Sequence, residues 1–78
     1  RDVILATRRP EGLSLHNVLA GEVVQVDVTG EGLRLVHVQL AGMRLLSLVT
    51  AAAERRLELA PGRSVLALIK AVGVESFG

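Results

Sequence analysis

The chain has 78 residues, enough for a single domain spanning residues 1–78 with a core that buries about 60 to 65% of the unfolded surface. Its formal charge is +1, from nine basic and eight acidic side chains, and Phe77 is its single aromatic residue. A nucleic-acid-binding role, which needs a basic groove and stacking aromatic rings, is therefore not expected. Because there is no cysteine, disulfides, thiolate metal sites and a cysteine nucleophile are excluded.

Half of the residues are hydrophobic, and nearly all of these are aliphatic, which is typical of a β-type core. No apolar run reaches the roughly 20 residues that span a bilayer, and no charged leader precedes a hydrophobic segment. The sequence begins at Arg1 without an initiator methionine. We therefore expect a soluble domain excised from a longer protein.

The first half of the chain predicts strands separated by turns. A brief strand is expected from Val3 to Ala6, before a turn-forming run from Arg8 to Gly12. A half-buried strand is expected from Val18 onward, because apolar and polar residues alternate between Val24 and Thr29.

The middle of the chain predicts a hairpin followed by a helix. Apolar residues alternate from Val36 to Leu40, and Ala41-Gly42 forms a tight connection to a strand from Met43 to Val49. Thr50 then stands at an N-cap position before strong helix formers. About two turns of helix are expected, ending near Leu57.

The last strand is expected from Ser64 to Val74, after a type II turn at Pro61-Gly62. In this strand and the one before the helix, the outward positions are also apolar: Leu46, Leu48, Leu66 and Leu68. A monomer rarely exposes such a patch. Either the chain itself covers these strands or a second copy does. Because the chain offers only one short helix as cover, we favour a homo-oligomer interface.

Two segments near the ends of the chain place polar or cationic groups among aliphatic residues. Ser14 and Asn17 follow the turn-forming run and are expected on a loop, whereas Lys70 lies inside the last predicted strand. Thr50 and the free N–H groups at Ala52 and Ala53 add a helix N-terminus, which favours anions. A tetrahedral dianion has only acceptor oxygens, so its pocket needs donors of these kinds.

Each of these residues also has a purely structural explanation. Thr50 caps the helix whether or not it binds a ligand. Ser14 and Asn17 can bond their own backbone, and Lys70 can be a solvated lysine that guards a sheet edge against aggregation. Their co-occurrence is what favours a binding site.

Three segments stand at compatible spacing: Ala6 to Leu19 (ATRRPEGLSLHNVL), Leu59 to Gly62 (LAPG) and Ala67 to Val72 (ALIKAV). In this order they resemble the C-terminal molybdate-binding domain, called Mop or TOBE, of the ATP-binding subunit of molybdate ABC transporters. The resemblance covers nearly the whole chain. It implies a mainly β fold, a five-stranded OB-like barrel with one short helix. It also implies that the domain pairs with a second copy and binds molybdate or tungstate between the copies.

The family's loop motif is Ser, a small or aliphatic residue, Arg and Asn, and the matching positions are Ser14, Leu15, His16 and Asn17. His16 replaces the arginine, so it keeps a donor but loses the bidentate fork and is mostly neutral at pH 7. We therefore expect weaker, pH-dependent binding, which a flat affinity profile from about pH 5.5 to 8 would contradict. On the structural interpretation His16 is a loop histidine, and with His37 as the only other histidine no metal site is expected.

The family's helix-start motif is Thr or Ser followed three positions later by Ser; Thr50 matches it and Ala53 does not. The lysine of the last strand matches as Lys70, followed by Ala71. At about 4 Å and an effective dielectric near 20, a lysine facing a dianion contributes ~8 kcal/mol before desolvation is subtracted. Lys70 is therefore expected to dominate the affinity, while the neutral donors set geometry and size.

The resemblance implies an accessory binding domain and not an enzyme, with no catalytic residue and no cofactor other than the oxyanion ligand. Within a parent ABC-type ATPase subunit it would be cytoplasmic, at the inner face of the cell membrane, and would meet the transporter's membrane subunits through that parent. The alternative is a structural dimerisation module without oxyanion binding. The departures at His16 and Ala53 argue for that alternative.

Overall fold

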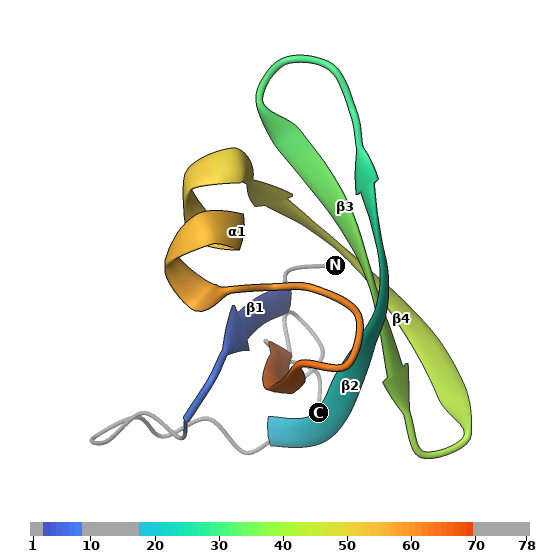
Figure 1. The fold of residues 1–78 in the computed structure, drawn as a ribbon. Helices are drawn as coiled ribbons and strands as arrows, with labels where there is room; N and C mark the ends of the chain where they lie inside the picture. Colours follow the sequence, from blue (N-terminus) through green and yellow to red (C-terminus); the bar gives the residue numbers. More distant parts are fainter. Residues whose placement is uncertain (1–2, 9–17, 70–78) are drawn as a thin grey trace, which may run out of the picture.

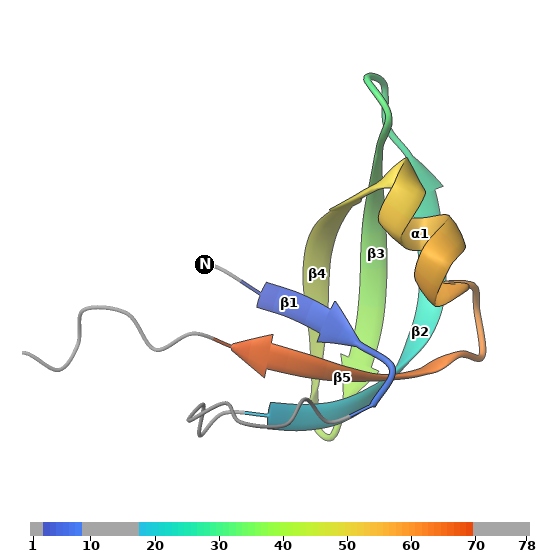
Figure 2. The ribbon, with the colours of Figure 1, turned by 90° about the vertical axis from the view of Figure 1, so that its left-hand side faces the viewer.

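The computed structural model describes residues 3–8 and 18–69 of the chain. They form one antiparallel sheet with the strand order β1-β5-β2-β3-β4. The elements are β1 (Val3–Ala6), β2 (Val18–Val28), β3 (Leu33–Leu40), β4 (Met43–Thr50), α1 (Ala51–Leu57) and β5 (Ser64–Ile69). The sheet is strongly curled, and α1 lies beside the end of β4 (Figures 1 and 2). This confirms the expected mainly β fold, an OB-like barrel of five strands with one short helix.

The predicted turns are confirmed. β3 and β4 form a hairpin in which Leu40 lies opposite Met43, and Gly42 takes a φ of 82° in the connection. The turn before β5 is closed by a hydrogen bond of 3.0 Å from the Arg63 N–H to the Ala60 carbonyl, and Gly62 has a φ of 99°. A positive φ at this position is what a type II turn requires, and glycine adopts it without steric cost.

β2 is the longest strand, and two different neighbours share it. Its first half pairs with β5, from Val18 opposite Leu68 to Glu22 opposite Ser64, and its second half pairs with β3. A β-bulge at Val24 interrupts the register with β3. Such a bulge bends a strand and increases its twist. It lets β2 pass from one part of the curled sheet to the other.

The alternation expected from Val24 to Thr29 is kept in the register from Gln25 to Val28, and the bulge lies at its start. Val23 is fully buried, Val24 and Val26 are half-buried, and Val28 is 76% exposed. The extra residue at Val24 moves Val23 onto the inner face, opposite Val38. A strict period of two therefore fails at Val24, where the bulge inserts one residue.

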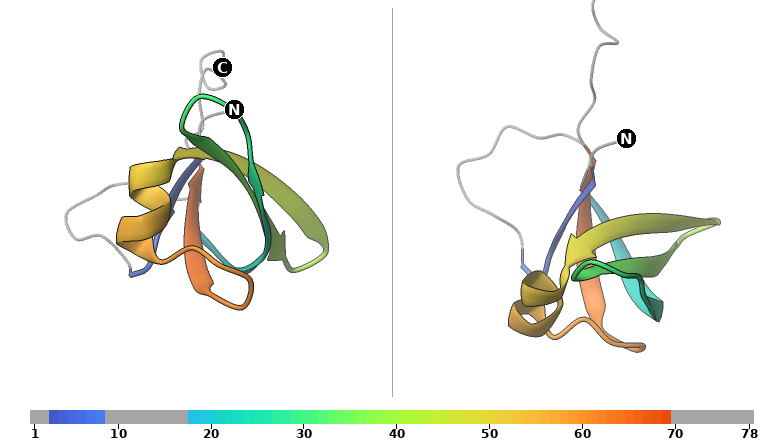
Figure 3. Two further views of the ribbon diagram at one scale, coloured as in Figure 1. Left: turned by 45° about the horizontal axis from the view of Figure 1, so that its top comes forward. Right: turned by 90° about the horizontal axis from the view of Figure 1, so that it is seen from above.

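The sheet curls on itself (Figure 3), and one cluster of buried residues forms the hydrophobic core. Its members are aliphatic and come from every strand and from the segment after α1: Leu5, Val23, Val36, Val38, Leu40, Leu45, Leu59, Val65 and Ala67. α1 contributes the partly buried Leu57 but no fully buried residue. The helix therefore closes one end of the curl without forming its centre.

The expected outward leucines divide into two pairs. Leu46 and Leu48 on β4 are 51% and 59% exposed, as predicted. For β5 the prediction is wrong, because Leu66 is half-buried and Leu68 is buried. β5 lies between β1 and β2, whose side chains flank it on both sides, whereas β4 lies at the edge of the sheet.

Candidate functional site

The structure describes two of the predicted site residues, Thr50 and Ala53, which stand at the junction of β4 and α1. The others lie outside the described residues: Ser14, Leu15, His16, Asn17, Lys70 and Ala71. The described part of the site is therefore this junction, together with the strand ends next to the other predicted residues.

Thr50 is the N-cap of α1, as predicted. Its backbone is extended, with φ −79° and ψ 157°, and its Oγ1 accepts a hydrogen bond of 3.0 Å from the Ala53 N–H. The expectation of a free N–H at Ala53 is therefore wrong, because the side chain of an N-cap threonine accepts the hydrogen bond of that amide. The Ala51 N–H is also engaged, donating to the Gly32 carbonyl at 2.8 Å. Among the described residues, the Ala52 N–H is therefore the amide of this first turn that remains to donate to a ligand.

An ion pair that was not predicted holds the junction against the sheet. Arg34 Nε lies 2.9 Å from Glu54 Oε1, with side chains 20% and 26% exposed, and it joins β3 to the first turn of α1. Arg34 stands in phase with the buried Val36 and Val38, so a charge at an inward position was the available signal in the sequence. Since Glu54 already balances its charge, Arg34 positions the helix and offers little to an anion.

The strand ends that border the other predicted residues lie side by side. Val18, the first residue of β2, is opposite Leu68 on β5, and Val3 on β1 is opposite Ile69. Asn17 directly precedes Val18 in the sequence, and Lys70 directly follows Ile69. The two described ends therefore meet at one end of the sheet.

Thr50 belongs to the opposite end of β2. It pairs with Leu33, and the neighbouring Arg34 pairs with Val28, the last residue of β2. A strand of 11 residues such as β2 spans roughly 33 Å when straight, and the bulge shortens this. Figure 2 shows the start of α1 well separated from the start of β2 and the end of β5. One copy thus does not bring Thr50 close to those strand ends, and an oxyanion is far smaller than the separation.

Comparison with known proteins decides the family, because residues 13–75 match the TOBE domain. The chain belongs to the TOBE domain family. It is 44% identical over 75 residues to the molybdenum import ATP-binding protein ModC of Rhizobium etli, covering 96% of this chain and 21% of the relative. The ModC of Granulibacter bethesdensis is 45% identical over 86 residues, covering 99% of this chain and 23% of the relative. The chain thus spans about a fifth of the length of these relatives.

A solved structure similar to this TOBE domain is the cytoplasmic molybdate-binding protein ModG in a form with molybdate bound. The TM-score is 0.79 with 38% identity, and the match covers 88% of this chain and 50% of that chain. The fold and the family that the sequence predicted are therefore both confirmed.

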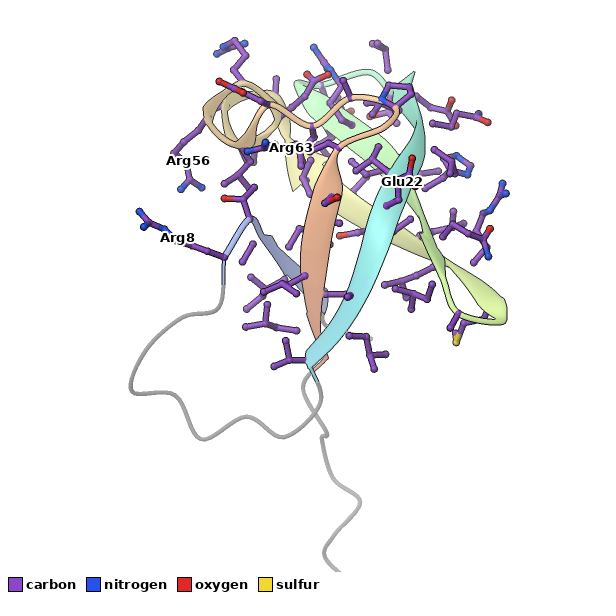
Figure 4. All side chains as sticks on the ribbon, turned by 60° about the horizontal axis from the view of Figure 1, so that its bottom comes forward. Arg8, Glu22, Arg56 and Arg63 are labelled. Atoms are coloured by element: carbon purple, nitrogen blue, oxygen red, sulfur yellow. The ribbon has the colours of Figure 1, made fainter. Side chains whose placement is uncertain are left out.

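The arginines of α1 in this TOBE domain lie at the C-terminal end of the helix. Arg55 and Arg56 are in its last turn, and Arg63 Nε donates to the Leu57 carbonyl at 3.2 Å. Figure 4 shows Arg8 and Arg56 on the same side of the molecule. Cations at a helix C-terminus stabilise the helix dipole. Arg55 and Arg56 therefore stabilise the C-terminal end of α1, and they lie away from Thr50 at its N-terminal end.

A hydrogen-bonded cluster lies on the outer face of β2 and β3. Asp27 Oδ2 lies 2.8 Å from His37 Nε2, and Asp27 Oδ1 accepts from Gln25 Nε2 at 2.8 Å. The hydrogen bond from Gln25, followed by that from His37, lowers the pKa of the Asp27 carboxyl from its usual value of 3.8. Among the described residues, no group of three or more histidine, cysteine or acidic side chains is placed to hold a metal ion.

Within the described ranges, α1 is too short to cross a membrane, and no other helix there is long and apolar enough to do so.

Proposed function

We propose that this TOBE domain binds molybdate or tungstate at a site that a second copy of the domain completes. The observation that carries the proposal is its similarity to ModG with molybdate bound, at a TM-score of 0.79 and 38% identity. The ModC relatives, which are molybdenum import proteins by name, support the same ligand class.

The need for a second copy rests on the separation of the two parts of the site. Thr50 lies at one end of β2, and the strand ends that border Asn17 and Lys70 lie at the other. A second copy supplies the missing part if its own strand ends meet the Thr50 junction of the first. Each oxyanion then lies between copies, with Thr50 from one and Lys70 from the other.

The residues divide the chemistry between charge and geometry. Lys70 supplies the charge, because a unit cation facing a dianion contributes ~8 kcal/mol before desolvation is subtracted. Ser14, Asn17, the Thr50 hydroxyl and the Ala52 N–H supply neutral donors, which select the size of a tetrahedral oxyanion. His16 adds a weaker donor where the family has arginine. Leu15, Ala53 and Ala71 complete the wall of the proposed site with backbone groups and apolar side chains.

The domain does not itself catalyse a reaction in this proposal. It reports intracellular oxyanion to a parent ABC-type ATP-binding subunit of a molybdate importer. That parent is cytoplasmic and peripheral to the cell membrane, where it meets the membrane subunits of the transporter. The relatives, of which this chain spans about a fifth, support this context.

Calorimetric titration of the chain with molybdate, tungstate and sulfate tests the proposal. We expect saturable binding of the first two and at least about 10-fold weaker binding of the smaller sulfate. Lys70→Ala should weaken molybdate binding by about 100-fold or more, since a close charge is lost. Arg56→Ala, which removes an exposed cation from the far end of α1, is the matched control and should bind as the wild type does.

The alternative function is a dimerisation module that binds no oxyanion. The engaged amide of Ala53 favours it, since one donor of the expected set serves the cap instead. Wild-type chain that forms dimers but takes up no molybdate would establish this alternative. Equal molybdate binding by wild type and Lys70→Ala would contradict the role assigned to the lysine.

A further inference from the structure

Three arginines gather where β1 ends, α1 ends and β5 begins. Arg56 lies in the last turn of α1, and Arg63 reaches the same helix end, since its Nε donates to the Leu57 carbonyl at 3.2 Å. Arg8 comes two residues after the end of β1, which pairs with β5. Both views in Figure 3 show the end of β1 beside α1, and Figure 4 shows the three arginines on one side of the molecule. We call Arg8, Arg56 and Arg63 the arginine patch.

No carboxylate neutralises the arginine patch among the described residues. The side chains that pair with carboxylates there are Arg34 and His37, both on β3. Arg8 and Arg56 are exposed, and the terminal N–H groups of Arg63 have no hydrogen-bond partner within the described ranges. Because like charges repel one another, this gathering does not by itself stabilise the fold.

Folding explains two of the three arginines. Arg56 complements the dipole at the C-terminal end of α1, and Arg63 satisfies a carbonyl of the last turn. Arg8 has neither role, since its exposed side chain forms no hydrogen bond or ion pair in the part of the chain that the structure describes. Arg8 is therefore the residue that distinguishes a binding surface from support of the helix.

The arginine patch suits carboxylates that a protein segment carries. A guanidinium group binds a carboxylate through two parallel N–H···O bonds. Two carboxylates border the patch. Glu58 is exposed and directly follows α1, and Glu22 is exposed and pairs with Ser64, the residue after Arg63. A uniformly anionic surface, such as a membrane leaflet or a nucleic-acid backbone, would meet these two glutamates as well as the arginines. A peptide can instead place its carboxylates individually against the arginines.

We propose that the arginine patch docks an acidic segment of a partner protein, in which aspartate or glutamate side chains pair with Arg8, Arg56 and Arg63. This surface goes beyond the proposed oxyanion site. Thr50 caps the N-terminal end of α1, whereas the patch lies at the C-terminal end of the helix. Partner docking and oxyanion binding therefore use different residues.

Fluorescence anisotropy of the 78-residue chain with a labelled peptide of alternating glutamate and glycine tests the surface. The same peptide with glutamine in place of glutamate is the neutral control. We expect saturable binding of the glutamate peptide that weakens as the NaCl concentration rises from about 0.05 to 0.3 M, because salt screens exposed ion pairs.

Variants of single charges locate the binding surface. Arg8→Gln should weaken binding of the glutamate peptide about 3- to 5-fold, the usual effect of one exposed ion pair. Arg8→Gln/Arg56→Gln should weaken it about 10- to 25-fold if the two effects add. Arg44→Gln removes an exposed arginine from β4, outside the patch, and should bind as wild type does. Since Arg8 forms no bond in the described part of the chain, Arg8→Gln keeps the test available even where the double variant folds poorly.

No binding of the glutamate peptide by the wild type, or equal weakening by Arg8→Gln and Arg44→Gln, would overturn the inference. Vesicles containing phosphatidylserine and free pyrophosphate are the competing probes. Binding of either of them through Arg8, without binding of the glutamate peptide, would assign the patch to lipid headgroups or to free phosphate and would equally overturn an acidic protein partner.

Molybdate calorimetry keeps this surface apart from the proposed function. Arg56→Gln should weaken peptide binding and bind molybdate as the wild type does. A wild type that binds the peptide but no molybdate would leave the arginine patch standing and refute the proposed function. Loss of molybdate binding in Arg56→Gln would place this arginine at the oxyanion site and contradict a separate surface.

Discussion

Gly21→Ala should destabilise the protein strongly, because β2 packs closely against Val38, Gln39 and Leu40 at Gly21. A Cβ at this position would stand 2.6 Å from Leu40 Cδ2, 2.8 Å from Val38 Cγ1 and 2.8 Å from the Gln39 backbone oxygen. The two side chains are buried and the oxygen is part of the sheet, so none of them can move away freely. Overpacking of this kind costs about 1 to 3 kcal/mol, and we expect the upper part of that range.

Gly30→Ala is the matched control, since a Cβ there meets nothing within 4 Å. Both substitutions reduce the freedom of the unfolded chain equally, which stabilises by about 0.4 to 1 kcal/mol, so their difference isolates the packing cost. We expect Gly21→Ala to be less stable than Gly30→Ala by about 2 to 3 kcal/mol in urea unfolding at one protein concentration. Equal midpoints for the two variants would refute the close approach of β2 and β3 at this point.

Three further predictions concern single side chains. Ser47→Ala should raise the free energy of unfolding by about 1 kcal/mol, because the Ser47 hydroxyl is buried with no hydrogen-bond partner among the described residues. Urea titration measures this change, and a loss of stability would contradict the prediction. Thr50→Ala should lower the free energy of unfolding by about 1 kcal/mol, because the N-cap hydrogen bond is lost, and Thr50→Ser should lower it by clearly less. Equal losses in the two variants would argue against the hydroxyl as the cap. In an NMR titration the Asp27 carboxyl should show a pKa below 3.8 that rises in Gln25→Ala, and an unchanged pKa would contradict the hydrogen-bond cause. Since this pKa is lowered in the folded state, the stability it contributes is present above about pH 3.8 and lost as the pH falls through the folded value.

Local features of the fold were predictable because they depend on a few neighbouring residues. The hairpin at Ala41-Gly42, the turn at Pro61-Gly62 and the cap at Thr50 follow from the conformations that glycine, proline and threonine favour. The bulge at Val24 was not predictable from alternation, because it depends on how β2 turns from β5 to β3. The burial of Leu68 likewise depends on the place of β5 in the strand order, which the pattern of one strand does not contain.

The candidate site was predictable in part. The cap at Thr50 is local, but the use of the Ala53 amide within that cap and the ion pair between Arg34 and Glu54 depend on the folded junction. The separation of Thr50 from the end of β5 depends on register along the whole of β2. The assignments of Ser14, Leu15, His16, Asn17, Lys70 and Ala71 stay predictions.

The most direct test of a site shared between copies is a mixing experiment with two impaired variants. Thr50→Asp keeps a good N-cap residue but places a negative charge against the dianion, and Lys70→Ala removes the cation. Each variant alone should bind little molybdate in calorimetry. After mixing and exchange, half of the dimers carry both variants and hold one intact site, so about a quarter of all sites should bind as the wild type does. A mixture that binds no more molybdate than the two variants measured separately would contradict a site built from Thr50 of one copy and Lys70 of the other.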